Sequence, residues 1–223
     1  MSPFRPHFEI LPPDQRALWQ LLSPSRKLGL VLYGGTAIAL RLGHRTSIDF
    51  DFFTEKPFDP DQLNRTLPFL GEATILQSQS NTLTVLTGSP IAGVKLSFFG
   101  NISFGRVGTP EANEDGILEV ASLVDLLATK LKVIQQRLEA KDYRDIAAIL
   151  RAGIKLEDGL SAAAELFGLG IQPSETVKAL TYFEGGDLDT LPESDKTQLS
   201  VAASSIYRIP ITGLASRSLS ISG

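Results

Sequence analysis

The N-terminal half of this chain is organised by residues 34–53, whose sequence is GGTAIALRLGHRTSIDFDFF. The short apolar run immediately before them predicts a buried strand. Gly34 and Gly35 then allow a tight turn, and residues 36–42 predict a helix that Thr36 could cap. The expected local order is therefore strand, glycine turn and helix.

The same stretch ends in a second predicted strand, residues 47–53. Alternation along a strand places Asp49 and Asp51 on one face and Ile48 and Phe50 on the other. Two carboxylates about 7 Å apart on one side of a strand can bind Mg²⁺ through hard oxygen ligands. The alternative is an edge strand whose acidic face meets solvent.

The glycine pair adds a second chemical feature. Backbone without side chains can approach a phosphate closely, and the N–H groups at the start of a helix favour an anion. Turn geometry alone also explains an isolated glycine pair. It is the combination of this turn with the paired carboxylates that favours a nucleotide and metal site.

The rest of the chain changes from strands to helices. Strands are predicted at residues 28–33, 73–79, 82–87 and 94–99, the last three as antiparallel neighbours. Apolar spacing predicts further helices at residues 14–22, 59–70, 123–138, 142–151, 157–167, 174–183 and 193–207. We expect an α+β fold with a small mixed sheet and flanking helices over residues 1–116 and a helical region over residues 117–223. The Ser- and Gly-rich tail, residues 213–223, is predicted to be peripheral.

Composition narrows the classes of protein. The 223 residues are 43% hydrophobic and 21% charged, which is typical of a globular chain with a sizeable core. A net charge of −4 argues against nucleic-acid binding by bulk charge, although a local basic groove stays open. The chain has no cysteine, so disulfides and thiolate sites are excluded, and two histidines argue against a His-rich metal site. Without a signal-like or membrane-spanning apolar stretch, we expect a cytoplasmic protein with no membrane partner.

Polar residues in the predicted helices supply a second group of candidates. Lys130 and Arg137 lie one heptad apart on the flank of the apolar stripe of the helix predicted at residues 123–138. They can either snorkel from the edge of a core or reach the phosphates of a nucleotide. Asp142 points near the apolar face of the next helix, where it can act as an N-cap or as a functional acid.

These positions together resemble the nucleotidyltransferases of the DNA polymerase β type, and more closely the AbiEii/AbiGii toxin family of abortive-infection and toxin–antitoxin systems. The resemblance spans residues 30–150. Its first signature is a glycine pair followed by a segment of the form R-x-S-x-D-x-D, here Arg45, Ser47, Asp49 and Asp51. Its second signature is a helical Lys, an Arg and then Asp-x-x-Asp, here Lys130, Arg137, Asp142 and Asp145.

The resemblance implies transfer of a nucleoside monophosphate from a nucleoside triphosphate (NTP), with Mg²⁺ or Mn²⁺, to a hydroxyl of an RNA such as tRNA or of a protein. It also implies a toxin and a partner antitoxin. The catalytic residues that it implies are Asp49, Asp51, Lys130, Asp142 and Asp145, of which Asp49 and Asp51 are the metal ligands. The nucleotide-binding residues that it implies are Gly34, Gly35, Thr36, Arg45, Ser47, Lys130 and Arg137. Asp142 is the implied base that activates the acceptor.

One position departs from the nucleotidyltransferase pattern. A third metal-binding carboxylate is expected on a later strand, where this chain has Ser97, and a hydroxyl is a poorer Mg²⁺ ligand. Three outcomes stay open: a site with one metal, use of Asp142 as the base, or loss of catalysis. The last would leave a nucleotide-binding or protein-interaction module of the same fold. Lys95 shares a face with Ser97, and we interpret that face as an ordinary exposed one.

Overall fold

The computed structural model describes residues 3–88 and 93–221 and divides into two compact units. The first, here called the sheet unit, comprises Met1–Gly105, Thr109–Ala121 and Ser216–Gly223. The second, the helical unit, comprises Arg106–Gly108 and Ser122–Ala215. The helical residues therefore leave the first unit after Ala121, close to the boundary expected at residue 116, but the C-terminal residues return to the sheet unit.

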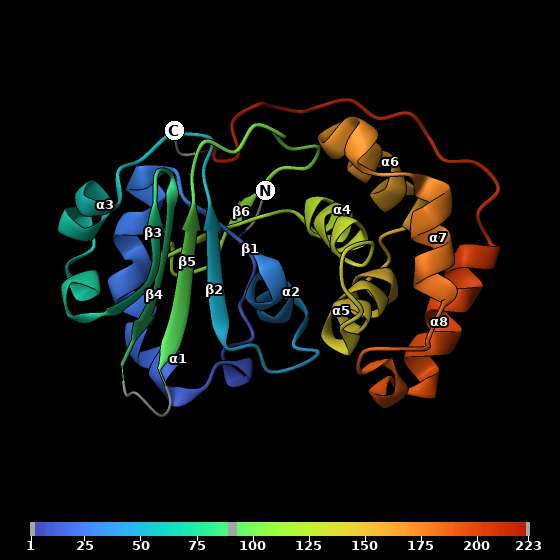
Figure 1. Ribbon diagram of the computed structural model, residues 1–223, viewed down its shortest axis with the longest axis horizontal. Coiled ribbons are helices and arrows are strands. Elements are labelled where there is room, and N and C mark those ends of the chain that lie inside the picture. The colour runs from blue at the N-terminus through green and yellow to red at the C-terminus, as the bar shows by residue number, and fades with distance from the viewer. Residues whose placement is uncertain (1–2, 89–92, 222–223) are drawn as a thin grey trace. The chain divides into compact units, whose positions relative to one another are not determined.

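The sheet unit is built on one mixed sheet, in which the described residues form seven strands in the order β3-β4-β5-β2-β1-β7-β6. Figure 1 shows β3, β4, β5 and β2 side by side. The strands are β1 (Val31–Tyr33), β2 (Asp49–Phe53), β3 (Thr74–Gln79), β4 (Thr82–Thr87), β5 (Val94–Phe99), β6 (Glu111–Ala112) and β7 (Glu119–Val120). The two short strands β6 and β7 were not expected, because two residues give no measurable alternation.

Strand pairing confirms the predicted mixed sheet. β3 pairs with β4 and β4 with β5, both antiparallel as expected. β2 lies between β1, to which it is antiparallel, and β5, to which it is parallel. The central strand β2 thus has neighbours on both sides, and the alternative of an acidic edge strand is wrong.

The faces of the central strands differ as alternation requires. Phe50, Phe52, Leu96 and Phe98 are completely buried on one face, where the Phe52 and Phe98 rings stack with centroids 5.4 Å apart. Asp49, Asp51 and Phe53 occupy the alternate positions of β2 and are partly exposed. Ile48 precedes the strand and is exposed, so only part of its predicted apolar face is buried. The core therefore fixes which way the two aspartates face.

Three α-helices of the sheet unit are α1 (Pro13–Leu18), α2 (Gly34–Leu42) and α3 (Pro60–Thr66). The helix predicted at residues 14–22 becomes 3-10 turns from Trp19, and Pro24 lies within them. Pro68 likewise follows the end of α3, where the predicted helix breaks into another 3-10 segment. Proline lacks the N–H that an α-helical hydrogen bond requires and disfavours a helical backbone in the residue before it, which explains the early end of α3.

Residues 218–221 of the C-terminal tail are bonded to the sheet unit, so the prediction of a peripheral segment is wrong for these residues. Glu119 is fully buried, and its carboxylate accepts hydrogen bonds from the Ser220 hydroxyl (2.6 Å) and the Ile221 N–H (2.7 Å). Glu55 accepts from the Ser218 hydroxyl and the Leu219 N–H at 2.8 and 3.0 Å. A buried carboxylate requires such donors, and the tail supplies them.

The helical unit consists mainly of α4 (Leu123–Val133), α5 (Ala140–Arg151), α6 (Leu156–Phe167), α7 (Pro173–Thr181) and α8 (Glu193–Ser204). Ser122 caps α4 by accepting a hydrogen bond from the Asp125 N–H. Gly159 of α6 allows close packing on α4, because a Cβ there would collide with the Leu127 side chain. In the described part of the chain, every helix is too short or too polar to cross a bilayer.

Candidate active site

The glycine turn is shaped around an aspartate. Gly34 has φ of +73°, a left-handed conformation that glycine adopts readily. A Cβ at this position would lie 2.5 Å from the Asp51 Oδ2 atom. The missing side chain therefore lets the Asp51 carboxylate come directly against the start of α2.

The second glycine makes room for an arginine. A Cβ on Gly35 would collide with the Arg45 guanidinium and would lie 3.2 Å from the Ser47 hydroxyl. Arg45 also donates to the Thr46 carbonyl at 3.0 Å. The first turn of α2 thus faces one anionic and one cationic group of the predicted motif.

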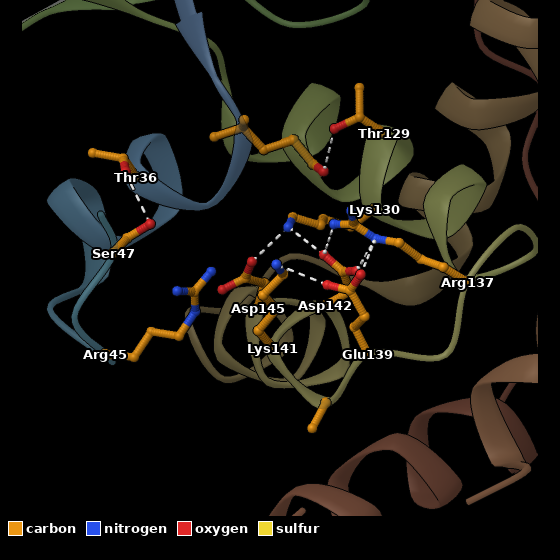
Figure 2. A network of polar contacts seen from close by, with 12 residues as sticks. Thr36, Arg45, Ser47, Thr129, Lys130, Arg137, Glu139, Lys141, Asp142 and Asp145 are labelled. Atoms are coloured by element: carbon orange, nitrogen blue, oxygen red, sulfur yellow. Dashed lines mark hydrogen bonds and ion pairs between the residues drawn. The ribbon is translucent and has the colours of Figure 1, made fainter. Parts of the chain in front are cut away.

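Thr36 has a different local role from the one expected. The described residues offer no side-chain cap at the start of α2, where Tyr33 is the N-cap residue, so the predicted Thr36 cap is wrong. The buried Thr36 hydroxyl contacts Ser47 Oγ at 2.9 Å (Figure 2). It also donates to the Asp49 carbonyl. These contacts attach α2 to the beginning of β2 and so position the two aspartates.

Asp49 has a partner on the neighbouring strand. The parallel pairing of β2 and β5 aligns Asp49 with Lys95 and Asp51 with Ser97. The Lys95 ammonium lies 3.1 Å from Asp49 Oδ2, and the two side chains are 42% and 34% exposed. This contact between Lys95 and Asp49 was not predicted, although the alternation that places Lys95 and Ser97 on one face was a signal for it.

The candidates of the helical unit form a charged network. The Lys130 ammonium lies 2.6 Å from Asp142 Oδ1 and 2.7 Å from Asp145 Oδ2. Arg137 donates through Nε to Asp142 Oδ2 at 2.8 Å and through a terminal nitrogen to Oδ1 at 3.2 Å. Figure 2 shows Lys130 directed between the two carboxylates, with Arg137 at the outer side of Asp142.

Burial separates the members of this network. The Asp142 and Asp145 side chains are 0% exposed and that of Lys130 is 8% exposed, whereas Arg137 is 45% exposed. Lys130 is therefore held inside rather than snorkelling outward. Glu139, and not Asp142, is the N-cap residue of α5, so the N-cap alternative for Asp142 is wrong.

The network sets the protonation of Asp142. Burial raises its pKa, but the Lys130 charge and the hydrogen bonds from Arg137 and Lys130 outweigh burial and hold the pKa below its ordinary value. The neighbouring Tyr143 has its pKa raised to about 12 by burial and by the Asp142 charge. Asp142 is consequently an ionised, fully paired carboxylate.

Each unit brings its own predicted residues together. The sheet unit holds Gly34, Gly35, Thr36, Arg45, Ser47, Asp49 and Asp51. The helical unit holds Lys130, Arg137, Asp142 and Asp145. We call the first group, without Thr36 and Ser47, the glycine–aspartate cluster, and the second the lysine–aspartate network.

Comparison with known proteins identifies the family. Residues 16–195, more than three quarters of the chain, match the family described as "Nucleotidyl transferase AbiEii toxin, Type IV TA system". The chain belongs to the AbiEii nucleotidyltransferase toxin family. The resemblance inferred from the two signatures is thereby confirmed.

Two individual proteins show how far the likeness extends. The AbiEii chain is 36% identical over 156 residues to the uncharacterized protein aq_aa25 of Aquifex aeolicus (strain VF5), covering 69% of this chain and 73% of that one. Its fold is similar to that of MenT4, nucleotidyltransferase toxin Rv2826c from Mycobacterium tuberculosis H37Rv, with a TM-score of 0.57. The two share 16% sequence identity, over 86% of this chain and 83% of MenT4. This likeness confirms the predicted α+β fold.

Nucleotidyltransferases of this kind use an NTP and a divalent metal. In residues 3–88 and 93–221, no group of three or more acidic, His or Cys side chains is arranged to hold a metal ion. Asp49 and Asp51 nevertheless fit one Mg²⁺, because magnesium is commonly bound through one or two carboxylates together with substrate phosphates and water. Gly34 lets the Asp51 carboxylate lie directly against the start of α2, which is consistent with that use.

Proposed function

We propose that this AbiEii protein transfers a nucleoside monophosphate from an NTP to an acceptor hydroxyl. The observation that carries the proposal is the glycine–aspartate cluster, in which the start of α2 at Gly34 lies against Asp51, one of the two same-face carboxylates of β2. In the reaction the acceptor oxygen forms a bond to the α-phosphorus, and the bond from that phosphorus to the bridging oxygen breaks. Pyrophosphate leaves, and a base takes the proton of the acceptor hydroxyl.

The start of α2 binds the phosphates in this proposal. Helices leave their first N–H groups without partners inside the helix, and these groups and the helix dipole attract anions. Within the described residues, the N-cap residue Tyr33 makes no side-chain hydrogen bond to this end of α2. Arg45, beside Gly35, adds a positive charge at the same turn.

Asp49 and Asp51 hold the divalent ion. When bound, Mg²⁺ or Mn²⁺ supplies charge stabilisation for the phosphoryl oxygens as the bond to the leaving group breaks. The protein positions the ion through the buried face of β2, since Phe50 and Phe52 lock the strand and the Thr36 contacts lock its beginning. Rigid placement of this kind is what phosphoryl transfer mainly requires from a protein.

The lysine–aspartate network acts mainly as a support for Arg137. Asp142 has both oxygens engaged by Lys130 and Arg137, so the paired carboxylate fixes the direction of the half-exposed guanidinium. Arg137 would neutralise charge on the triphosphate, as the family resemblance implies. For Asp142 to act as the base, it would have to exchange these partners for the acceptor hydroxyl.

We also propose a biological setting for this reaction. The acceptor is an RNA such as tRNA or a protein, the protein acts in the cytoplasm, and an antitoxin restrains it. The family membership supports a toxin that uses a nucleotide. An acidic protein that binds RNA through a limited patch should show a shallow dependence of affinity on salt concentration.

A labelling experiment tests the transfer reaction. The protein is incubated with each α-labelled NTP, Mg²⁺, and either total RNA or total protein, and labelled acceptor is separated by electrophoresis. We expect label with at least one NTP, and its loss in Asp51→Asn. The matched control is Asp61→Asn, which removes an exposed carboxylate of α3 in the same unit. Equal labelling by the wild type and Asp51→Asn would contradict the proposal.

A second function is favoured by the missing third carboxylate. With only two acids on the strand face, a nucleotide-binding module without catalysis is the competing explanation. It predicts that each NTP with Mg²⁺ raises the melting temperature while no acceptor is labelled. If any acceptor is labelled and this labelling requires Asp51, the explanation by a non-catalytic nucleotide-binding module is excluded.

A further inference from the structure

Lys95 is a charged residue in an unusual place. It lies on β5, which has β4 on one side and β2 on the other. Lysines are common on edge strands, where they prevent pairing with other chains, but β5 is an interior strand. Protection of a sheet edge therefore does not explain this lysine.

Stability does not explain it either. Lys95 and Asp49 are both more than one third exposed, and exposed ion pairs contribute only about 0.2–1 kcal/mol to folding. The buried side of β5 is already filled by Leu96 and Phe98. An uncharged residue at position 95 should therefore change the free energy of unfolding by no more than about 1 kcal/mol.

The position of Lys95 relates it to the acids of the site. Asp49, Asp51, Lys95 and Ser97 occupy alternate positions of two paired parallel strands, so they share one face of the sheet. This is where a third carboxylate would lie beside Asp49 and Asp51. Instead, the ammonium of Lys95 is 3.1 Å from Asp49, and the aligned Ser97 is almost fully buried.

The net charge of the site indicates what Lys95 does in place of a third carboxylate. A site with three carboxylates and two divalent cations carries the same net charge as one with two carboxylates, one lysine and one divalent cation. We propose that the Lys95 ammonium takes the place of a second divalent cation, so that the site binds a single metal ion per nucleotide. Lys95 then stabilises negative charge on the transferred phosphoryl group. This inference rests on the proposed function and specifies the cations of that site.

The test counts metal ions. The full chain is saturated with an NTP analogue whose α–β bridge cannot be cleaved, and Mn²⁺ per bound nucleotide is measured by equilibrium dialysis and electron paramagnetic resonance. We expect one Mn²⁺ in the wild type and in Lys95→Ala. We expect two in Lys95→Glu, because a third carboxylate then joins Asp49 and Asp51, and Mn²⁺ should raise the melting temperature of this variant more than that of the wild type.

Transfer rates provide the second readout. Lys95→Ala should lower kcat by about 10²-fold, the usual effect of removing one charge-stabilising donor, with an unchanged melting temperature. Lys95→Arg should recover part of the rate, since it keeps the charge but not the shape. Lys178→Glu is the matched control for charge reversal, because its ammonium pairs with Glu175 at the surface of α7.

The outcomes separate this inference from the function on which it rests. Two Mn²⁺ in the wild type, one in Lys95→Glu, or a wild-type rate in Lys95→Ala would each overturn the inference while transfer by the wild type stands. A wild type that binds the analogue but labels no acceptor would overturn the proposed function, and with it the catalytic part of the inference.

Discussion

The two pairs of aspartates in this protein are similar in sequence spacing but opposite in environment. Asp49 and Asp51 lie on the partly exposed face of a strand, and Asp49 contacts one exposed lysine. Asp142 and Asp145 are 0% exposed and share the buried ammonium of Lys130. The difference shows that acidity alone does not identify a ligand site, because solvent access decides whether a carboxylate can accept a new cation.

The physical basis of the difference is desolvation. A buried carboxylate is stable only when other groups replace its water, and Lys130 and Arg137 do so for Asp142. A carboxylate at the surface keeps its water and can exchange it for Mg²⁺. We therefore expect substitutions in the first pair to affect transfer and those in the second to affect stability.

The largest effect is expected from the exposed pair. The double variant Asp49→Asn, Asp51→Asn should lower the transfer rate by at least roughly 10³-fold, since a metal ion contributes several kcal/mol to the transition state. Its free energy of unfolding, measured with urea, should change by less than about 1 kcal/mol because both side chains are partly exposed. A large loss of stability in this variant would remove the contrast between the pairs.

The second-largest effect is expected from removing Lys130, the cation that the buried Asp142 and Asp145 share. Lys130→Met leaves Asp142 and Asp145 buried without their shared ammonium, and it should lower the free energy of unfolding by about 3–5 kcal/mol. Adding Asp142→Asn and Asp145→Asn to this variant should restore part of the loss. Urea unfolding of the three proteins measures both changes, and a single variant as stable as the wild type would contradict the burial argument.

The sheet unit also contains a buried acid, Glu119, which can be compared with Asp142 and Asp145. A chain that ends at Arg217 removes both donors to Glu119 and should lower the free energy of unfolding by about 3 kcal/mol, since an unsatisfied buried charge is left. A chain that ends at Ile221 keeps these donors and is the control. If both truncated chains have the same free energy of unfolding as the full chain, the tail contacts do not stabilise the sheet unit.

The smallest effect is a pH dependence. The folded pKa of Asp142 lies below its unfolded value of about 3.9, so its contribution is complete above that pH and is lost as the pH falls through the folded pKa. Each unit of pKa difference corresponds to about 1.4 kcal/mol. Below pH 4 the wild type should therefore lose stability more steeply than Asp142→Asn, as measured by urea unfolding at a series of pH values. Equal slopes would show that Asp142 is not paired in the folded state.

Much of the site could be predicted from local sequence. The glycine turn, the face shared by Asp49 and Asp51, and the strands β4 and β5 follow from short-range spacing, and the structure has them where they were expected. The family signatures extended the prediction to Lys130 and Asp142. Local spacing did not indicate that Lys130 is buried, because a residue on the flank of an apolar stripe can face either way.

The sequence by itself determined the turn at Gly34, the shared strand face of Asp49 and Asp51, and membership of the AbiEii family. Only the tertiary structure decided that Lys95 lies beside Asp49, and that Ser220 satisfies Glu119, which is 101 residues away along the chain. The reason is that turns and alternation are set by neighbouring residues. Contacts between residues that are distant along the chain depend on strand pairing and burial, and the local spacing of residues does not reveal them.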